Sequence, residues 1–144
     1  ILLPSVEHIG SPLDFLHWAA LLKSVSGYNN YRRLYGKTTA ANVVDYLVLN
    51  RKFPRSIIYC IDHAEQNLRK INGTMGSSGF SNDAEKAIGS LRSKLELSEV
   101  QDVMEFGLHE YLDQIQTEII GISEVIFNQY FKIQPNLLEN SSNQ

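Results

Sequence analysis

Several features that commonly identify a protein are scarce in this chain of 144 residues. It has a single cysteine, Cys60, so an intrachain disulfide framework is excluded and a reducing, cytoplasmic location is expected. A formal net charge of −3 at pH 7 argues against a general nucleic-acid-binding surface. No apolar run approaches the roughly 20 residues that span a bilayer, and no signal peptide is visible. The alternating pattern of a half-buried strand is also missing.

Recognisable catalytic patterns are lacking as well. The sequence shows no Ser-His-Asp arrangement, no Cys-His pair and no glycine-rich nucleotide loop. Cys60 stands among Ile57, Ile58 and Ile61, which predicts a buried small hydrophobe rather than a nucleophile. We therefore expect neither a cofactor nor catalysis by this chain alone.

Helical periodicity is what the chain does contain. Apolar residues make up 43% of the sequence and recur at spacings of three and four. This predicts an all-α fold, an antiparallel bundle of about five to six helices with one long C-terminal helix. The expected helices cover about 13–26, 28–35, 40–49, 54–72, 82–97 and 98–131.

Capping residues and loops set the expected boundaries. Ser11 and Thr39 are expected N-caps, and Ser81 with Asp83 is expected to cap the helix that follows the glycine-rich loop 73–79. The loop is read as the linker of a helical hairpin. We expect three regions, an N-terminal extension at 1–10, a helical bundle domain at 11–133 and a disordered tail at 134–144.

A basic cluster at 51–56 is the strongest functional signal. Pro54 is expected to open a helix, because the missing N–H of proline costs nothing in a first helical turn. Cations near that positive end of a helix dipole are disfavoured by roughly 0.3–1 kcal/mol each, so a cluster of them indicates a nearby anion. The cations concerned are Arg51, Lys52 and Arg55, with Arg32 and Arg33 upstream.

Two interpretations of these arginines are open. In the first, Arg32, Arg33 and Arg55, with Tyr31 and Ser56 beside them, bind a phosphate, a carboxylate or a partner protein. In the second, Arg55 or Arg32 forms ion pairs within the bundle. The carboxylates available for such pairs are Asp45, Glu105 and Asp113.

A weak alternative is a metal site on the last helix. Glu105, His109 and Asp113 are four residues apart and would share one face of a continuous helix. Metal sites in bundles use a Glu-x-x-His spacing with facing carboxylates, whereas the Glu-to-His spacing here is four. A solvated or arginine-paired face is the simpler interpretation, so no metal is expected.

Glu65 and Arg69 are also four residues apart, on the helix expected after Pro54. Such a pair on a helix surface contributes about 0.2–0.5 kcal/mol. We interpret it as a surface pair without a functional role.

Three stretches together resemble a known family. Residues 24–36, SVSGYNNYRRLYG, resemble the family pattern SxSAYExYRRRYG. Residues 43–49 followed by Phe53-Pro54-Arg55-Ser56 are similar to its V-x-FLLLDxxFPRSV pattern, and residues 108–112 ending in Tyr130-Phe131 are similar to its C-terminal helix. The family is the bacterial Alpha-E domain, whose members are all-helical and are often encoded beside, or fused to, circularly permuted ATP-grasp proteins and transglutaminase-like peptidases.

The resemblance implies a role in an ATP-grasp-linked peptide or amide-bond system. Family members are about twice as long, and the Glu-Arg motif that names them lies in their N-terminal half, so the match implied is to the C-terminal half. The leading hypothesis is a scaffold or substrate-presenting partner of an ATP-grasp-type protein. The alternatives are a subunit of a peptide-ligating or modifying enzyme completed by an absent N-terminal half, and a structural dimerisation bundle. We expect self-association or a missing half as partner, and neither nucleic acid nor membrane.

Overall fold

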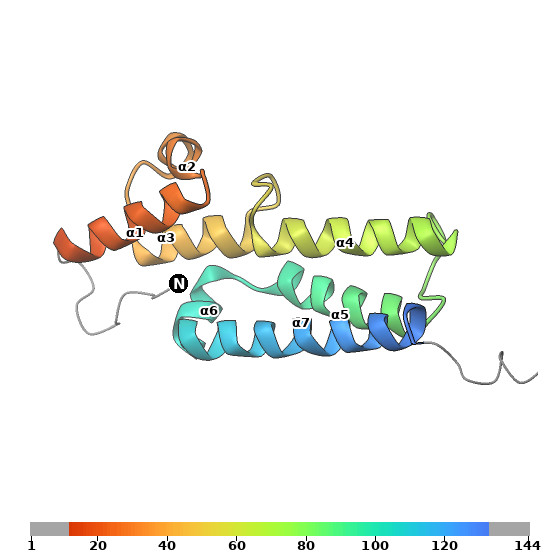
Figure 1. The fold of residues 1–144 in the computed structure, drawn as a ribbon. Helices are drawn as coiled ribbons and strands as arrows, with labels where there is room; N and C mark the ends of the chain where they lie inside the picture. The colour runs from red at the N-terminus through yellow and green to blue at the C-terminus, as the bar shows by residue number, and fades with distance from the viewer. Residues whose placement is uncertain (1–11, 133–144) are drawn as a thin grey trace, which may run out of the picture.

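The computed structural model describes residues 12–132, in which seven α-helices and one short π-helix occur and no strand is found (Figure 1). The all-α prediction is therefore confirmed. The expected extension at 1–10, the Ser11 cap and the tail at 134–144 lie outside the described residues. The elements are α1 (Pro12–Ser24), α2 (Tyr28–Tyr35), α3 (Ala40–Val44), the π-helix η2 (Asp45–Leu49), α4 (Ile57–Asn72), α5 (Asp83–Leu97), α6 (Val100–Phe106) and α7 (Leu108–Tyr130).

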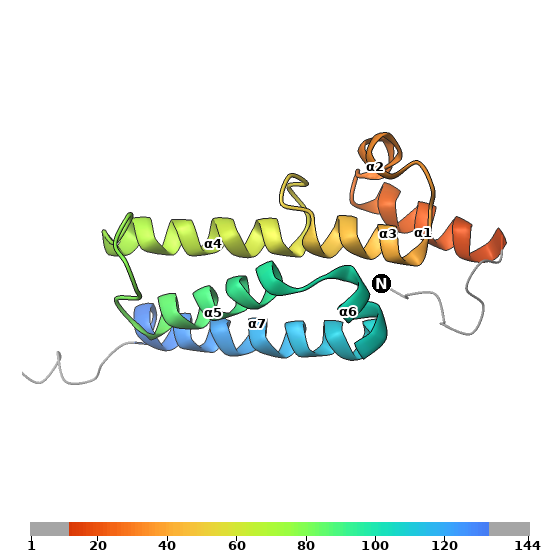
Figure 2. The same cartoon turned by 180° about the vertical axis from the view of Figure 1, so that it is seen from behind.

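One long rod organises the molecule. α3, η2 and α4 follow one another along it, interrupted by the protruding loop 50–56 (Figure 1). α5 packs against α4, as expected for a helical hairpin joined by the glycine-rich loop, and α7 packs against α5. α1 and α2 lie at the α3 end of the rod, on the side away from α7 (Figures 1 and 2). We call α1, α2 and residues 50–56 the cap, and α4, α5 and α7 the body.

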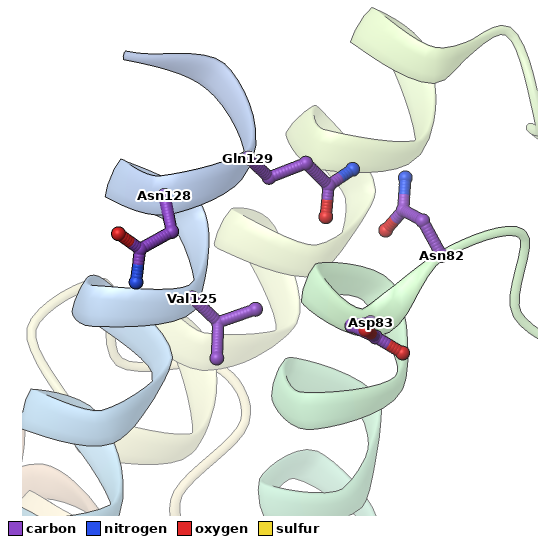
Figure 3. A pocket seen from close by; sticks show the side chains of 5 residues that line it. All are labelled: Asn82, Asp83, Val125, Asn128 and Gln129. Atoms are coloured by element: carbon purple, nitrogen blue, oxygen red, sulfur yellow. The ribbon is translucent and has the colours of Figure 1, made fainter. Parts of the chain in front are cut away.

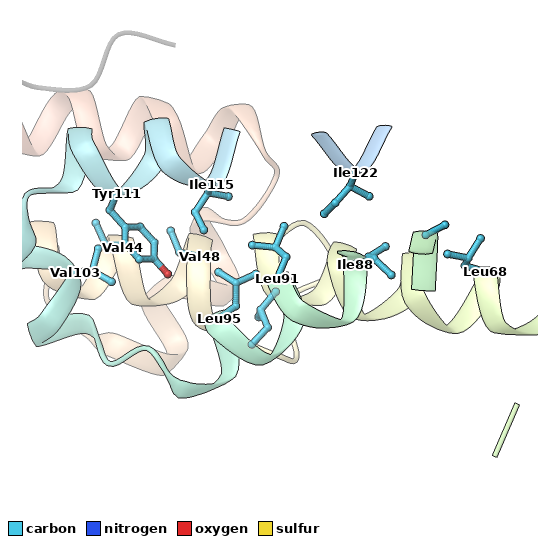
Figure 4. Packing of buried hydrophobic residues seen from close by; sticks show 12 residues of the cluster. Val44, Val48, Leu68, Ile88, Leu91, Leu95, Val103, Tyr111, Ile115 and Ile122 are labelled. Carbon is cyan, nitrogen blue, oxygen red and sulfur yellow. The ribbon is translucent and has the colours of Figure 1, made fainter. Parts of the chain in front are cut away.

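Two hydrophobic clusters hold these parts together. The larger joins the rod to α5, α6 and α7 (Figure 4), and the smaller joins α1, α2 and α3 to the loop 50–56. Val43 belongs to the smaller cluster and Val44 to the larger, while the partly buried Leu108 packs against both. The smaller cluster consists of Trp18, Leu22, Tyr31, Val43, Tyr46 and Phe53.

Three of the helices have an N-cap side chain that accepts a hydrogen bond from the first turn. Thr39 accepts a hydrogen bond from the backbone N–H of Asn42 at 3.2 Å, which confirms the predicted cap. The N-cap residue of α5 is Asn82, whose side-chain oxygen accepts a hydrogen bond from the backbone N–H of Glu85 at 2.9 Å. The prediction of Ser81 as this N-cap residue was therefore wrong by one position. Ser81 instead donates its backbone N–H to the Glu85 carboxylate. This exchange is a capping box shifted by one position.

Pro54 does not open α4. The helix begins at Ile57, and Ser56 caps it by accepting from the N–H of Tyr59 at 3.2 Å. Asn50 closes the preceding loop, because its side-chain oxygen accepts the N–H groups of Lys52 and Phe53. The cations of this segment therefore lie on a compact loop rather than in the first turn of a helix.

The expected long C-terminal helix is broken at Gly107. This residue has φ 108°, a conformation that L side chains rarely adopt, and it separates α6 from α7. A Cβ at this position would also lie 2.3 Å from a carboxylate oxygen of Glu110. The break raises the number of α-helices above the five to six expected.

Cys60 is exposed on α4, so the prediction of a buried cysteine was wrong. Its isoleucine neighbours, Ile57, Ile58 and Ile61, turn toward the larger cluster, and Cys60 falls beside that stripe. Among residues 12–132, no helix combines the length and apolarity that crossing a bilayer requires.

Candidate functional site

Arg32 and Arg33 lie on the outer side of α2, because tyrosines fill its inner side. Tyr31 is fully buried, whereas both arginines and the neighbouring Leu34 are exposed. Among residues 12–132 neither arginine forms an ion pair, and Arg32 lies over the Tyr28 ring with 6.0 Å between the guanidinium carbon and the ring centroid. Two guanidinium groups on α2 are thus available to an external anion.

Tyr31 is part of the scaffold rather than of a binding surface. Its ring stacks on Tyr35 at 5.0 Å and packs edge-on against Tyr46 at 5.4 Å, measured between ring centroids. Its hydroxyl donates to the backbone oxygen of Lys37 at 2.6 Å. Tyr31 therefore packs in the core and fixes the orientation of α2, rather than facing a ligand beside the arginines.

Tyr35 ties α2 to the π-helix. Its hydroxyl donates to the Asp45 carboxylate at 2.6 Å and accepts from the Asn50 amide at 3.3 Å. Burial, followed by the hydrogen bond to Asp45, raises the pKa of Tyr35 to about 12. The phenol therefore remains protonated near neutral pH. The Asp45 carboxylate accepts the hydrogen bond from Tyr35, and it forms no ion pair with Arg32 or Arg55.

The turn between α1 and α2 requires close packing at Gly27. A Cβ there would lie 2.9 Å from the ring of Phe53 and 3.0 Å from the ring of Tyr46. The Tyr46 hydroxyl also donates to the Gly27 oxygen at 3.2 Å. Glycine at this position lets the start of α2 pack directly on Tyr46 of the rod and Phe53 of the loop 50–56.

Arg55 connects the loop 50–56 to the end of α1. Its guanidinium donates to the backbone oxygen of Val25 at 2.6 Å, although the side chain is exposed. The contact is internal, as the second interpretation required, but the acceptor is a helix-end carbonyl rather than Asp45, Glu105 or Asp113. Arg55 thus anchors the loop and keeps donors on its surface.

Ser56 has no capacity left for a ligand. It is fully buried, its hydroxyl donates to the Asn50 oxygen at 2.6 Å, and the same oxygen accepts the Tyr59 N–H. The first-turn amide that an anion would need is therefore capped internally. Of the five predicted site residues, Arg32, Arg33 and Arg55 remain at the surface, while Tyr31 and Ser56 are structural.

The weak metal alternative loses its geometric basis. Glu105 belongs to α6, whereas His109 and Asp113 belong to α7, beyond the break at Gly107. Within the described part of the chain, no three His, Cys, Asp or Glu side chains are grouped so that they could hold a metal ion.

Buried ion pairs between α4 and α5 are what the sequence reasoning missed. Glu65 is buried and accepts from Arg69 at 3.0 Å and from Arg92 at 2.5 Å. Arg92 also contacts Glu96 at 2.6 Å, and Glu96 contacts Arg51 at 3.1 Å. The predicted surface pair of Glu65 and Arg69 is thus the centre of a buried network. Arg92 and Glu96, four residues apart on the next helix, were the available signal.

Electrostatics within this network favour the ionised forms. Burial alone would lower the pKa of Arg92, but its hydrogen bond to Glu65 and the charges of Glu65 and Glu96 raise that pKa above its ordinary value. A hollow of about 270 Å³ opens beside Glu65, Arg69 and Arg92. Since both guanidinium groups already face carboxylates, we do not assign an anion to it.

Glu85 fastens the glycine-rich loop to α5. Its side chain is fully buried and accepts from Thr74 at 2.6 Å, Asn72 at 2.7 Å and the N–H of Ser81 at 3.0 Å. The backbone hydrogen bond from Ser81, together with the bond from Thr74, lowers the pKa of Glu85 to about 2. This carboxylate has a structural role, because its lone pairs are used internally.

A larger hollow, of about 610 Å³, lies between the start of α5 and the end of α7 (Figure 3). Three carboxamides and one carboxylate line it, so it offers no cation for an anionic ligand. Its lining residues are Asn82, Asp83, Val125, Asn128 and Gln129.

Charge is divided unevenly between the two ends of the sequence. Residues 12–56 contain seven lysines and arginines and two aspartates, whereas residues 57–132 contain six basic and twelve acidic residues. The excess of positive charge therefore coincides with the cap and the α3 end of the rod. Its basic members are Lys23, Arg32, Arg33, Lys37, Arg51, Lys52 and Arg55.

Comparison with known proteins gives one match. The model of the Alpha-E family, described as a predicted alpha-helical domain with a conserved ER motif, matches residues 2–131. The 144-residue sequence nevertheless contains no Glu-Arg dipeptide. No curated protein and no solved structure shows significant similarity to the chain.

Proposed function

The chain belongs to the Alpha-E family, and from this premise we propose that it is a non-catalytic helical scaffold whose cap binds an acidic partner or substrate. The family resemblance described above implies that this partner is an ATP-grasp-type protein of a peptide or amide-bond system, or the acidic peptide that is presented to such a protein. The cap is the part of the chain whose chemistry fits such a partner.

The observation that carries the proposal is the pair Arg32 and Arg33 on α2. Both are exposed and form no ion pair among residues 12–132, whereas Arg69 and Arg92 of the body are paired with buried carboxylates. Leu34, exposed beside them, adds apolar contact area. Guanidinium groups next to an apolar side chain are well suited to a carboxylate-bearing protein surface.

The same observation bears on the alternatives. We expect a bundle that serves only dimerisation to pair its arginines internally, and Arg32 and Arg33 are not paired in this way. An enzyme would need a second polar constellation facing these arginines. Among the described residues on the inner side of α2, the polar groups of Tyr31, Tyr35 and Asp45 are instead bonded to one another or to the backbone.

Titration of an oligo-glutamate peptide, inorganic phosphate and ATP into the purified chain tests the proposal. We expect the peptide to bind with an affinity that falls as salt rises, because screening weakens exposed charge pairs. The Arg32→Ala/Arg33→Ala variant should bind it at least about tenfold more weakly, a loss of about 1.4 kcal/mol.

The matched control is Lys70→Ala/Lys86→Ala, which removes two exposed cations from the body. It should bind the peptide as the wild type does. Equal binding by the wild type and the arginine variant would contradict the proposal. Co-expression with an ATP-grasp protein from the same genome then tests the partner, with loss of co-purification expected for the arginine variant only.

A further inference from the structure

The outer face of α7 carries a stripe of exposed side chains. Ile120, Phe127 and Phe131 are between 53% and 67% exposed, and the rings of the two phenylalanines stack at 6.2 Å. Asp113 and Glu124 lie on the same side, because spacings of seven, four, three and four residues return to one face of a helix. The buried residues of α7 point the opposite way, toward α5.

The charged residues of this stripe, Asp113 and Glu124, are both acidic. From residue 95 to residue 131 the sequence has eight aspartates and glutamates and no lysine or arginine. Phe127 and Phe131 form the C-terminal end of the stripe, and Glu124 follows them toward the N-terminus. A surface that packs on this end must therefore be apolar where it meets the phenylalanines and basic where it meets Glu124.

α1 presents such a surface. Leu13 and Leu16 are each 60% exposed, and Ala20 and Lys23 are exposed on the same face at spacings of three and four residues. The opposite face of α1 holds Trp18, which packs in the smaller cluster. The outer stripe of α1 thus runs from apolar at its N-terminal end to basic at its C-terminal end.

We propose that the outer stripe of α1 in one copy of the chain packs antiparallel against the outer stripe of α7 in a second copy. In this orientation the leucines of α1 meet the phenylalanines of α7, and Lys23 lies toward Glu124. With Leu13 opposite Phe131, the ten residues from Leu13 to Lys23 place Lys23 opposite Gly121, about 5 Å along the axis from Glu124 at 1.5 Å per residue. The antiparallel arrangement also places opposite helix-dipole ends together.

Within one chain the two stripes do not meet, because α1 and α7 lie on opposite sides of the rod (Figures 1 and 2). The contact is therefore between different surfaces of two copies, which leaves a free stripe at each end and allows larger assemblies to form. It uses α1 and α7 and leaves Arg32 and Arg33 free for the partner proposed above.

Sedimentation velocity over a concentration series tests this contact. The mean mass of the wild type should rise with concentration. Leu16→Asp and Phe127→Asp should each weaken association at least about tenfold, because each puts a charge on an apolar side of the contact. Both residues are exposed, so far-UV circular dichroism should be unchanged. A wild type that stays monomeric at every concentration overturns the proposal.

A charge exchange identifies the orientation. Lys23→Glu and Glu124→Lys should each associate more weakly than the wild type, and an equimolar mixture of the two should recover association. The mixture of Lys86→Glu with Glu99→Lys is the matched control, since it makes the same charge changes at exposed sites outside the stripes. The variants Lys86→Glu and Glu99→Lys should associate as the wild type does, both alone and mixed. A mixture of Lys23→Glu with Glu124→Lys that associates no better than either variant alone overturns the proposed contact.

The two proposals fail separately. Oligo-glutamate binding by a strictly monomeric wild type refutes the contact between copies and leaves the cap as the partner site. Association that Phe127→Asp disrupts, without any peptide binding, supports the contact between copies and refutes the cap as the partner site.

Discussion

Arginine side chains have different surroundings in the body and on α2 of the cap. In the body, Arg69 and Arg92 point into the seam between α4 and α5, where both pair with Glu65 and Arg92 pairs with Glu96 as well. In the cap, Arg32 and Arg33 point outward, and the interior is built from aromatic rings whose hydroxyls bond to backbone oxygens or to Asp45. Charge stabilises the fold in the body, whereas the two arginines of α2 are left for contacts with other molecules. The arginines of the loop 50–56 are intermediate, since Arg51 contacts Glu96 and Arg55 donates to the Val25 oxygen. A guanidinium is thus a guide to binding only where no internal carboxylate accepts it.

The strongest test of this contrast is Glu65→Ala. The substitution leaves Arg69 and Arg92 facing each other beside the buried seam, and breaking a buried pair from one side costs about 3–5 kcal/mol. We expect the free energy of unfolding, measured by urea titration, to fall by about 3 kcal/mol, since both arginines are partly solvated. Glu99→Ala removes an exposed carboxylate and should change it by less than about 0.5 kcal/mol. Similar values for the two variants would mean that the seam does not depend on its charges.

The corresponding test in the cap is Gly27→Ala. The added methyl group would press on the rings of Phe53 and Tyr46, and overpacking of this kind costs about 1–3 kcal/mol. Gly121→Ala is the matched control, because no atom lies within 4 Å of its added Cβ. In α7 that change should stabilise the protein by up to about 1 kcal/mol. Thermal unfolding of both variants checks the opposite signs.

Acid should weaken the body through Glu85. Its pKa is about 2 in the folded protein against an ordinary 4.5, so the folded state favours the ionised carboxylate. The stability it contributes is fully present above about pH 4.5 and is lost as the pH falls from there to about 2. In Glu85→Gln, the free energy of unfolding should depend less on pH across this window than in the wild type. Urea titrations at several pH values check this. If the free energy of unfolding falls with acid as steeply in Glu85→Gln as in the wild type, other carboxylates control the pH dependence.

The smallest effect on stability is expected for Arg32→Ala/Arg33→Ala. Both side chains are exposed and unpaired among residues 12–132, so the free energy of unfolding should change by less than about 0.5 kcal/mol. Urea titration of the double variant checks this. A loss above about 1 kcal/mol would show that these arginines stabilise the fold, which would remove the contrast between cap and body.

Much of the fold could be predicted because apolar spacing reports directly which helix faces are buried. The stripes of α4, α5 and α7 predicted the larger cluster, and Thr39 and Gly73 marked true helix ends. The break at Gly107 escaped prediction because a helical glycine and one with positive φ look alike in a sequence. Asn82 likewise competed with the adjacent Ser81 as a cap, and only the backbone conformation separates them.

The candidate site could be predicted only in part. The sequence identified Arg32, Arg33 and Arg55 as residues to examine, because cations near the helix start expected at Pro54 indicate an anion. That helix begins instead at Ile57. The sequence could not show that the hydroxyls of Tyr31 and Ser56 donate hydrogen bonds to backbone oxygens. Nor could it show that Glu65 is buried, because a spacing of four residues is the same for surface and interior pairs. These outcomes depend on which helices face one another.

Leu108, the first residue after the Gly107 break, touches both hydrophobic clusters. Because Leu108 packs against both, disruption of one cluster removes packing contacts from the other, and the two clusters are expected to unfold together. A partner that binds the cap should therefore raise the unfolding temperature of α5 and α7 as well, by mass action on a single cooperative transition. A helix that continued through residue 107 would leave this residue elsewhere on its face, and the two clusters would lose a shared side chain.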